Sequence, residues 1–209
     1  MDESGTMLEP CCLATTIGSL PHTDAQRGTE LILKHTPEIP SWVQLPKRTF
    51  FENMMVQFTE GLPGLAQGDE RVYFDTAAPS FVDEVTVFYS RYLAVTDEGN
   101  LDALESFGIS AQYGSGFGEF IAQLERDTSP RIAIKGQVTG PFTLGINLLD
   151  QEDRCSYYDD QLRDVVIKLV SMKALWQIQR LRRFSTPMMI FFDEPALVGF
   201  GSQTLITVS

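Results

Sequence analysis

Strand-like and helix-like patterns of hydrophobic residues alternate along the 209-residue chain. Short runs typical of buried strands occur at Leu13–Ile17, Trp42–Leu45, Arg131–Gly136 and Met188–Phe192. Between them, apolar residues at three- and four-residue steps, with capping residues and prolines at the ends, predict helices. The predicted helices cover residues 25–35, 50–62, 79–96, 117–126 and 157–184. Strands that alternate with helices predict an α/β fold in which helices cover a parallel sheet of about four strands.

Small and polar residues follow three of the predicted strands. They are Gly18–Ser19 after the first, Thr139–Gly140 after the third and Asp193–Glu194 after the last. Ligands of parallel α/β proteins bind at the C-terminal ends of the strands, so we expect the three segments to meet in one site. Backbone amides in the first of them suit an anion. A purely structural alternative for the acidic pair is that one carboxylate caps a following helix with Pro195 in its first turn.

Other chemically suggestive residues carry less information. The run Gly114–Gly118 lacks the spacing of a phosphate-binding loop and follows no clear strand, which predicts a surface loop. His22 lies next to the Gly18–Ser19 segment, near enough in sequence to contact a substrate, whereas His35 is expected at a helix end. The three cysteines have no metal-binding spacing, and their odd number fits a reducing compartment better than a disulfide framework.

Composition limits which partners the protein could bind and where in the cell we expect it. A net charge of −12 argues against nucleic acid or an anionic membrane as the main partner. No apolar run approaches the roughly 18 residues that span a bilayer, and the N-terminus lacks the pattern of a secretory signal. We therefore expect a cytoplasmic protein. Because few residues follow Asp193, we also expect one domain over residues 1–209 that is truncated at its C-terminal side.

Three segments together resemble the catalytic, C-terminal domain of cobalamin-independent methionine synthase. They are Thr15–Pro21 (TTIGSLP), Ile134–Pro141 (IKGQVTGP) and Asp193–Leu197 (DEPAL), and they occur in the order that the family has. The resemblance spans nearly the whole chain. It implies a (β/α)8 TIM barrel of which this chain carries the first half, about four parallel strands with their covering helices.

The resemblance also implies a set of substrate contacts. In the family, the Ile-Gly-Ser loop holds the homocysteine carboxylate, the aspartate of the Asp-Glu-Pro-Ala motif binds the amino group, and the Thr-Gly-Pro segment lines the pocket. These chemical pairings are sound, because amides suit a carboxylate and a carboxylate suits an ammonium. The substrate-binding residues implied in this chain are Ile17, Gly18, Ser19, Gln57, Thr139, Gly140, Asp193 and Glu194.

The chain departs from the family pattern at two points. Gln57 stands where the family has a second amino-binding glutamate, so this position supplies no charge. The family also activates the thiol with a zinc ion held by His, Cys, Glu and Cys, because zinc favours the thiolate. All four ligands lie beyond the Asp-Glu-Pro-Ala motif, and Cys11, Cys12 and Cys155 match none of them. We therefore expect no metal site in this chain.

The expected function is methyl transfer to a homocysteine-like thiol acceptor, with this chain carrying the acceptor-binding half. It implies a small-molecule thiol amino acid and a methyl donor as partners, and no catalytic residue is assigned. Two alternative hypotheses stay open. Within the same superfamily, the chain could belong to a uroporphyrinogen decarboxylase-like enzyme or a corrinoid-linked methyltransferase. The hypothesis of another class is a non-catalytic half-barrel that assembles with a partner or with itself through an exposed sheet edge.

Overall fold

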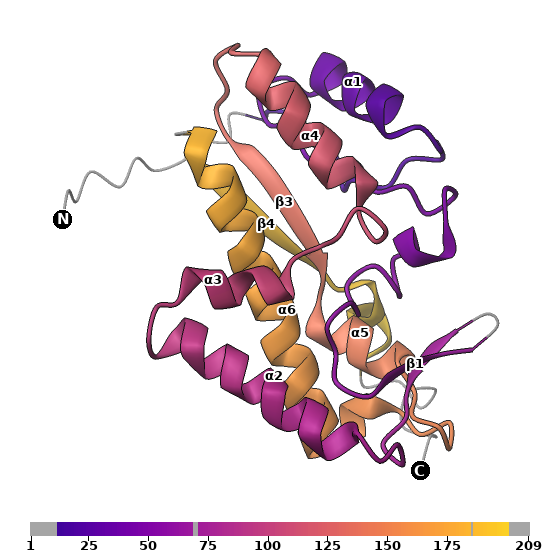
Figure 1. Ribbon diagram of the computed structural model, residues 1–209. Helices are drawn as coiled ribbons and strands as arrows, with labels where there is room; N and C mark the ends of the chain where they lie inside the picture. The colour runs from indigo at the N-terminus through magenta and orange to yellow at the C-terminus, as the bar shows by residue number, and fades with distance from the viewer. Residues whose placement is uncertain (1–11, 69–70, 185, 201–209) are drawn as a thin grey trace.

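The computed structural model describes residues 12–68, 71–184 and 186–200, and the fold is mixed α/β with two small sheets (Figure 1). The helices are α1 (Ala25–His35), α2 (Phe81–Thr96), α3 (Leu101–Leu104), α4 (Ser115–Arg126), α5 (Pro141–Asn147) and α6 (Asp160–Leu181). Short 3₁₀ helices are η1 (Phe50–Glu52), η2 (Glu105–Phe107), η3 (Ser156–Tyr158), η4 (Arg182–Phe184) and η5 (Pro195–Gly199). The strands are β1 (Leu65–Gln67), β2 (Val72–Phe74), β3 (Ile134–Thr139) and β4 (Met188–Asp193).

The predicted parallel pairing is present between β3 and β4, which run in register from Ile134 opposite Met188 to Thr139 opposite Asp193. Single parallel bridges extend this sheet on the far side of β3, joining Ser41 to Lys135 and Ser19 to Gln44. The described residues form no closed barrel. The second sheet is an antiparallel hairpin of β1 and β2, which the sequence pattern did not predict.

A side chain from α6 explains why Trp42–Leu45 joins the sheet by bridges instead of forming a regular strand. Gln177 donates its amide to the carbonyl of Gln137 at 3.0 Å and accepts from the Gln137 backbone N–H at 3.2 Å. Gln137 in turn donates its side-chain amide to the Trp42 carbonyl at 2.8 Å. Two glutamine side chains thus replace the backbone bonds that a regular strand would make here.

Three helices cover the parallel segments. Ile32 of α1 packs on Val43 and Leu45, and α6 contacts both β3 and β4. Figure 1 shows α1 and α4 side by side, with α6 along β3 and β4. Every residue of β3 is buried, whereas β4 is only partly covered. The core is therefore centred on β3.

Four of the predicted helices are confirmed, with small changes at their ends. Asp24 caps α1 by accepting from the Arg27 N–H at 3.1 Å, and Asp159 caps α6 by accepting from the amides of Gln161 and Leu162. Helix α2 begins at Phe81 instead of Pro79. In the part of the chain that the structure describes, no helix combines the length and apolarity that a membrane crossing would require.

The helix predicted over residues 50–62 is wrong. Only η1 forms there, because Asn53 leaves the helical region at ψ 141° and its side chain accepts from the Met55 N–H at 3.0 Å. Such a local side-chain bond offers the backbone an alternative to the helix. The chain continues in turns that carry Val56, Gln57 and Phe58 into the interior.

The surface loop predicted at Gly114–Gly118 is also wrong. Helix α4 begins at Ser115, and Gly116 lies buried against the neighbouring strand segment. A Cβ atom at Gly116 would lie 1.9 Å from the carbonyl oxygen of Val43. The glycine therefore allows α4 to approach the backbone of the sheet directly.

Two predicted strand boundaries change. The strand predicted at Arg131–Gly136 lies at Ile134–Thr139, so Gly136 is inside it, where Ile190 and Gln177 fill the space above the glycine. No regular strand forms at the predicted residues Leu13–Ile17. This part of the chain joins the sheet through one bridge further along, at Ser19. In both cases the contact with a neighbouring element lies further along the chain than the apolar run indicates.

A pair of alanine substitutions tests the packing of α4. We expect Gly116→Ala to lower the free energy of unfolding by about 3 kcal/mol, because its methyl group meets backbone instead of a movable side chain. Gly118→Ala is the matched control in the same helix, since nothing lies within 4 Å of its Cβ position. It should raise the free energy of unfolding by up to about 1 kcal/mol through helix propensity. Equal urea midpoints for the two variants would contradict this packing.

Candidate functional site

The three sequence segments meet at one end of the parallel sheet. Thr139 is opposite Asp193, and the Gly140 N–H donates to the Asp193 carbonyl at 2.8 Å. On the other side, the Gln44 N–H donates to the Gly18 carbonyl at 2.8 Å. Because all these segments run parallel, these residues lie at their C-terminal ends, where the fold class places ligands.

Gly18 occupies a position that only glycine fills easily. Its φ is +121°, and a Cβ atom there would lie 2.3 Å from Nε2 of Gln137 and 3.0 Å from Oε1 of Gln44. The next residue, Ser19, is exposed, and so is the side chain of Ile17. Ser19 therefore stands exposed at the end of the sheet, whereas Gly18 itself is buried.

A row of polar side chains on β3 leads to this end, and our sequence reasoning did not assign its first two members to the site. Lys135, Gln137 and Thr139 occupy alternate positions, so they share one face of the strand. All three are buried. The signal was available in the sequence as a polar residue at every second position of an otherwise apolar strand.

Each member of the row bonds to the backbone of another segment. Nζ of Lys135 donates to the Thr16 carbonyl at 2.5 Å, and Oγ1 of Thr139 donates to the Met54 carbonyl at 3.0 Å. Oε1 of Gln137 is buried and has no hydrogen-bond partner within the described residues. A buried oxygen without a donor is uncommon and marks a place where a donor group would be stabilised.

Lys135 and Asp193 form the charged part of the site. Burial lowers the pKa of Lys135 to about 8, although the negative charge of Asp193 acts in the opposite direction. Burial likewise raises the pKa of Asp193, and the positive charge of Lys135 opposes this rise. The ring of Phe191 lies 4.4 Å from Nζ of Lys135. The ammonium group therefore sits beneath an aromatic ring and acts on the site mainly through its charge.

Gln57 is brought to the site by the turns that replace the predicted helix. It is fully buried. Its Oε1 accepts from Nε2 of Gln44 at 2.8 Å, and its Nε2 donates to the Tyr113 carbonyl at 2.6 Å. Both ends of the amide are thus engaged within the protein.

Glu194 precedes η5 and Pro195 begins it, but the Glu194 side chain makes no capping bond to η5, so the capping of the following helix considered for the acidic pair is wrong for Glu194. The carboxylate bonds to the earlier helix α5 instead. Its two oxygens accept from the N–H groups of Phe142 at 3.0 Å and Thr143 at 2.7 Å, in the first turn of α5. A Cβ atom at Gly140 would lie 2.1 Å from Cδ of Glu194, so this glycine makes room for the carboxylate. Substrate contact by Glu194 stays a prediction.

Side chains that could bind zinc do not cluster in the part of the chain that the structure describes. Within residues 12–68, 71–184 and 186–200, no three His, Cys, Asp or Glu side chains are grouped so that they could hold a metal ion. Cys155 is buried, which raises the pKa of its thiol, and Cys12 is exposed. Cys11, which we expect not to bind zinc, lies outside the described residues.

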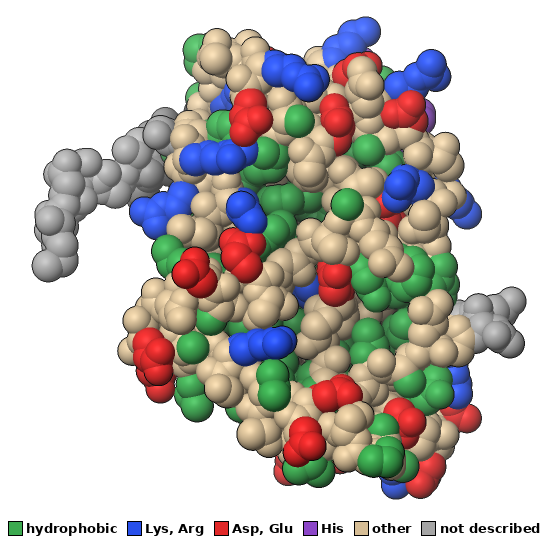
Figure 2. All heavy atoms as spheres, viewed as in Figure 1, with side chains coloured by type: hydrophobic (Ala, Val, Ile, Leu, Met, Phe, Trp, Pro, Cys, Tyr) green, Lys and Arg blue, Asp and Glu red, His purple; other side chains and the backbone are tan. Residues whose placement is uncertain are grey.

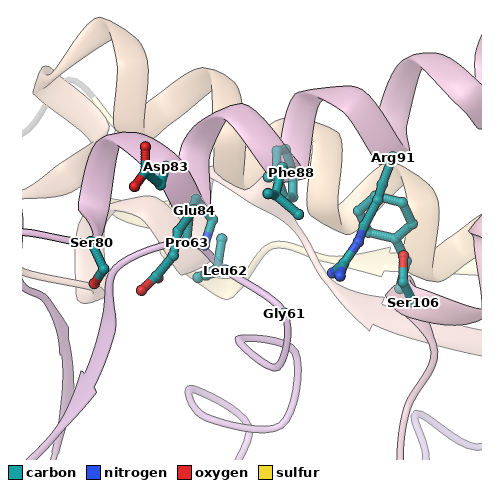
Figure 3. A pocket seen from close by; sticks show the side chains of 11 residues that line it. Gly61, Leu62, Pro63, Ser80, Asp83, Glu84, Phe88, Arg91 and Ser106 are labelled. Carbon is teal, nitrogen blue, oxygen red and sulfur yellow. The ribbon is translucent and has the colours of Figure 1, made fainter.

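A cavity of about 390 Å³ lies in a different part of the molecule, between the turn at Gly61–Pro63 and α2 (Figure 3). Figure 3 shows Ser80 and Asp83 at one end of it and Arg91 at the other. None of the residues predicted for the site lines this cavity. On the face drawn in Figure 2, Lys and Arg side chains lie among Asp and Glu side chains, without a continuous basic area.

Comparison with known proteins assigns no family. The chain matches no protein-family model, no curated protein and no solved structure.

The coupling of Lys135 to Asp193 can be measured by titration. We expect Asp193→Asn to lower the pKa of Lys135 below about 8, because the variant removes the negative charge that raises it. Carbon-13 shifts of the lysine Cε atoms report each titration, and a Lys173→Met variant assigns the two buried lysines.

Lys173 of α6 is the internal control. It is also fully buried, its pKa is lowered to about 8 by burial, and its charged neighbour is Glu60 instead of Asp193. Glu60→Gln should lower the pKa of Lys173 and leave that of Lys135 unchanged. Between pH 8 and 10.5 the unfolded chain binds more protons at these lysines, so their contribution to stability rises with pH. An unchanged Lys135 titration in Asp193→Asn would contradict the pairing.

Proposed function

We propose that this chain forms the acceptor-binding half of an enzyme that transfers a methyl group to a thiol, built on about four parallel strands of a (β/α)8 barrel. The observation that carries the proposal is the convergence of Gly18–Ser19, Thr139–Gly140 and Asp193 at one sheet end. These segments are far apart in the sequence, and they are the ones that resemble the methionine synthase family.

In this proposal the chain binds and orients the acceptor. The exposed Ser19 offers its backbone N–H and its hydroxyl, which suit an acidic group of the substrate. Within the described residues, Asp193 accepts a hydrogen bond at its backbone carbonyl but none at its side-chain carboxylate. The carboxylate is therefore available to a ligand. In this proposal Thr139, which lies opposite Asp193, and Gly140 line the space for the acceptor. Holding a thiol in one orientation is the contribution that such a site makes to catalysis.

The binding of a thiol acid tests this proposal directly. We expect L-homocysteine or its amino-free analogue 4-sulfanylbutanoate to shift the backbone amide signals of Gly18, Ser19 and Gly140 in nitrogen-15 spectra. The Gly18→Ala variant should abolish these shifts, because its methyl group collides with the Gln137 side chain.

Gly118→Ala serves as the control for that variant, since its Cβ position is open and lies on α4 away from the loop. It should bind as the unmodified chain does. Shifts confined to the cavity beside α2, or no shifts with either thiol acid, would refute the proposal.

A second candidate function, assembly through the exposed edge of the sheet, is favoured by a separate observation. Large apolar side chains at and after β4 are exposed: Phe191 by 41%, Phe192 by 48%, Leu197 by 52%, Val198 by 96% and Phe200 by 69%. Within the described residues, β4 pairs with β3 only. An apolar patch beside an unpaired strand is a surface on which another chain can add.

Light scattering at increasing protein concentration tests assembly. We expect a mass above that of one chain, reduced to one chain by Val198→Lys. Val82→Lys is the matched control, because Val82 is 71% exposed on α2 and lies outside the patch. A single-chain mass for the unmodified protein at all concentrations would count against this second function.

A further inference from the structure

A second cavity, of about 300 Å³, lies between α4 and α6. This volume is in the range of small-molecule pockets. Figure 2 shows a hollow with apolar side chains in this part of the molecule, below α4. None of the residues predicted for the acceptor site lines the cavity, so it is a separate feature of the fold.

The wall of this α4–α6 cavity is apolar and contains a tryptophan. Phe117 and Trp176 are both buried, and the centres of their rings lie 4.9 Å apart. The buried Ile109 and the half-buried Ile121 belong to the same wall. Gly118 adds no side chain to the lining, and nothing lies within 4 Å of its Cβ position. An aromatic group that covers this wall is stabilised by the apolar area that it buries.

Two arginines, Arg180 of α6 and Arg183 of η4, line the same cavity. The guanidinium carbon of Arg180 lies 5.5 Å from the centre of the Trp176 ring. Nη2 of Arg180 donates to Glu105, and Nη2 of Arg183 donates to Glu125. The N–H groups at Nε and Nη1 of both arginines have no acceptor within the described residues. Several charged donors are therefore available beside the apolar wall.

The two glutamates do not cancel this preference for an anion. Arg180 and Arg183 are the only charged residues in the lining, whereas Glu105 and Glu125 lie outside it. All four side chains are about half exposed, and ion pairs of this kind contribute about 0–1 kcal/mol. An anion in the cavity would meet the guanidinium groups at hydrogen-bond distance and the glutamates only over a longer one. Because Coulomb energy falls with distance, the attraction exceeds the repulsion.

We infer that the α4–α6 cavity is a binding site for a small aromatic carboxylate. The ring of the ligand would cover the wall at Phe117 and Trp176, and its carboxylate would accept from Arg180 and Arg183. The planar guanidinium group suits this pairing, since its N–H groups match the two oxygens of a carboxylate. The inference goes beyond the proposed acceptor site and uses none of its residues, so the failure of one leaves the other intact.

A nitrogen-15 titration at pH 7 with 2-naphthoate and its uncharged isostere 2-naphthamide tests the inference. The chain has two tryptophans, and the indole N–H signal of Trp176 reports on the cavity. Trp42, which is buried and bonded to Gln177, is the internal control, and a Trp176→Phe variant assigns the signals. We expect 2-naphthoate to shift the Trp176 signal alone and to bind at least about tenfold more tightly than 2-naphthamide.

Three results would overturn the inference. They are equal affinity for the two naphthalene ligands, no shift of the Trp176 signal with 2-naphthoate, and acetate binding as tightly as 2-naphthoate does. Acetate carries the carboxylate without the ring, so it separates a site for aromatic acids from a general attraction of anions.

Substitutions at the rim of the cavity give an independent outcome. Arg180→Gln and Arg183→Gln should each weaken 2-naphthoate binding about threefold or more and leave 2-naphthamide binding unchanged. Arg182→Gln is the matched control, because Arg182 bonds to Gln179 and does not line the cavity. Glu125→Gln should tighten 2-naphthoate binding, since it removes a carboxylate that competes for Arg183. Unchanged 2-naphthoate affinity in both Arg180→Gln and Arg183→Gln would overturn the inference.

Discussion

The carboxamide of Gln177 is the interaction on which the arrangement of the sheet depends. Its oxygen accepts from Nε1 of Trp42 at 2.9 Å and from the Gln137 N–H, and its nitrogen donates to the Gln137 carbonyl. One side chain on α6 thereby satisfies three buried polar groups in two segments of the sheet. Buried backbone groups must be paired, so the helix, β3 and the Trp42 segment are held in one arrangement.

The site follows from this arrangement. Because Gln177 takes the backbone groups of Gln137, the side chain of Gln137 turns to the Trp42 carbonyl and lies against Gly18. Gln44 then reaches Gln57, and Gln57 reaches Tyr113. A chain of neutral amides therefore lines the interior beside Lys135 and holds together the segments that meet at this end of the sheet.

Local sequence signals predicted much of the fold because they act over a few residues. The side chains of Asp24 and Asp159 bond to amides within the next turn, so their helices begin where the sequence indicates. Where a local signal competed with the hydrophobic pattern, the pattern misled us. Asn53 ends the first turn of a helix that its apolar neighbours predict. Gly116, with its neighbouring glycines, resembles a loop until the contact with Val43 shows why glycine is needed.

The sequence by itself determined which segments alternate, which ends carry small or acidic residues, and that position 57 is uncharged. It also contained the alternating polar positions of β3, which are a local property of the strand. Only the tertiary structure decided that Lys135 bonds to the Thr16 carbonyl, that Glu194 is bonded to α5, and that the amide of Gln57 is engaged at both ends. The physical reason is that these bonds join residues far apart in the chain, so their geometry arises only when the helices and strands have packed together.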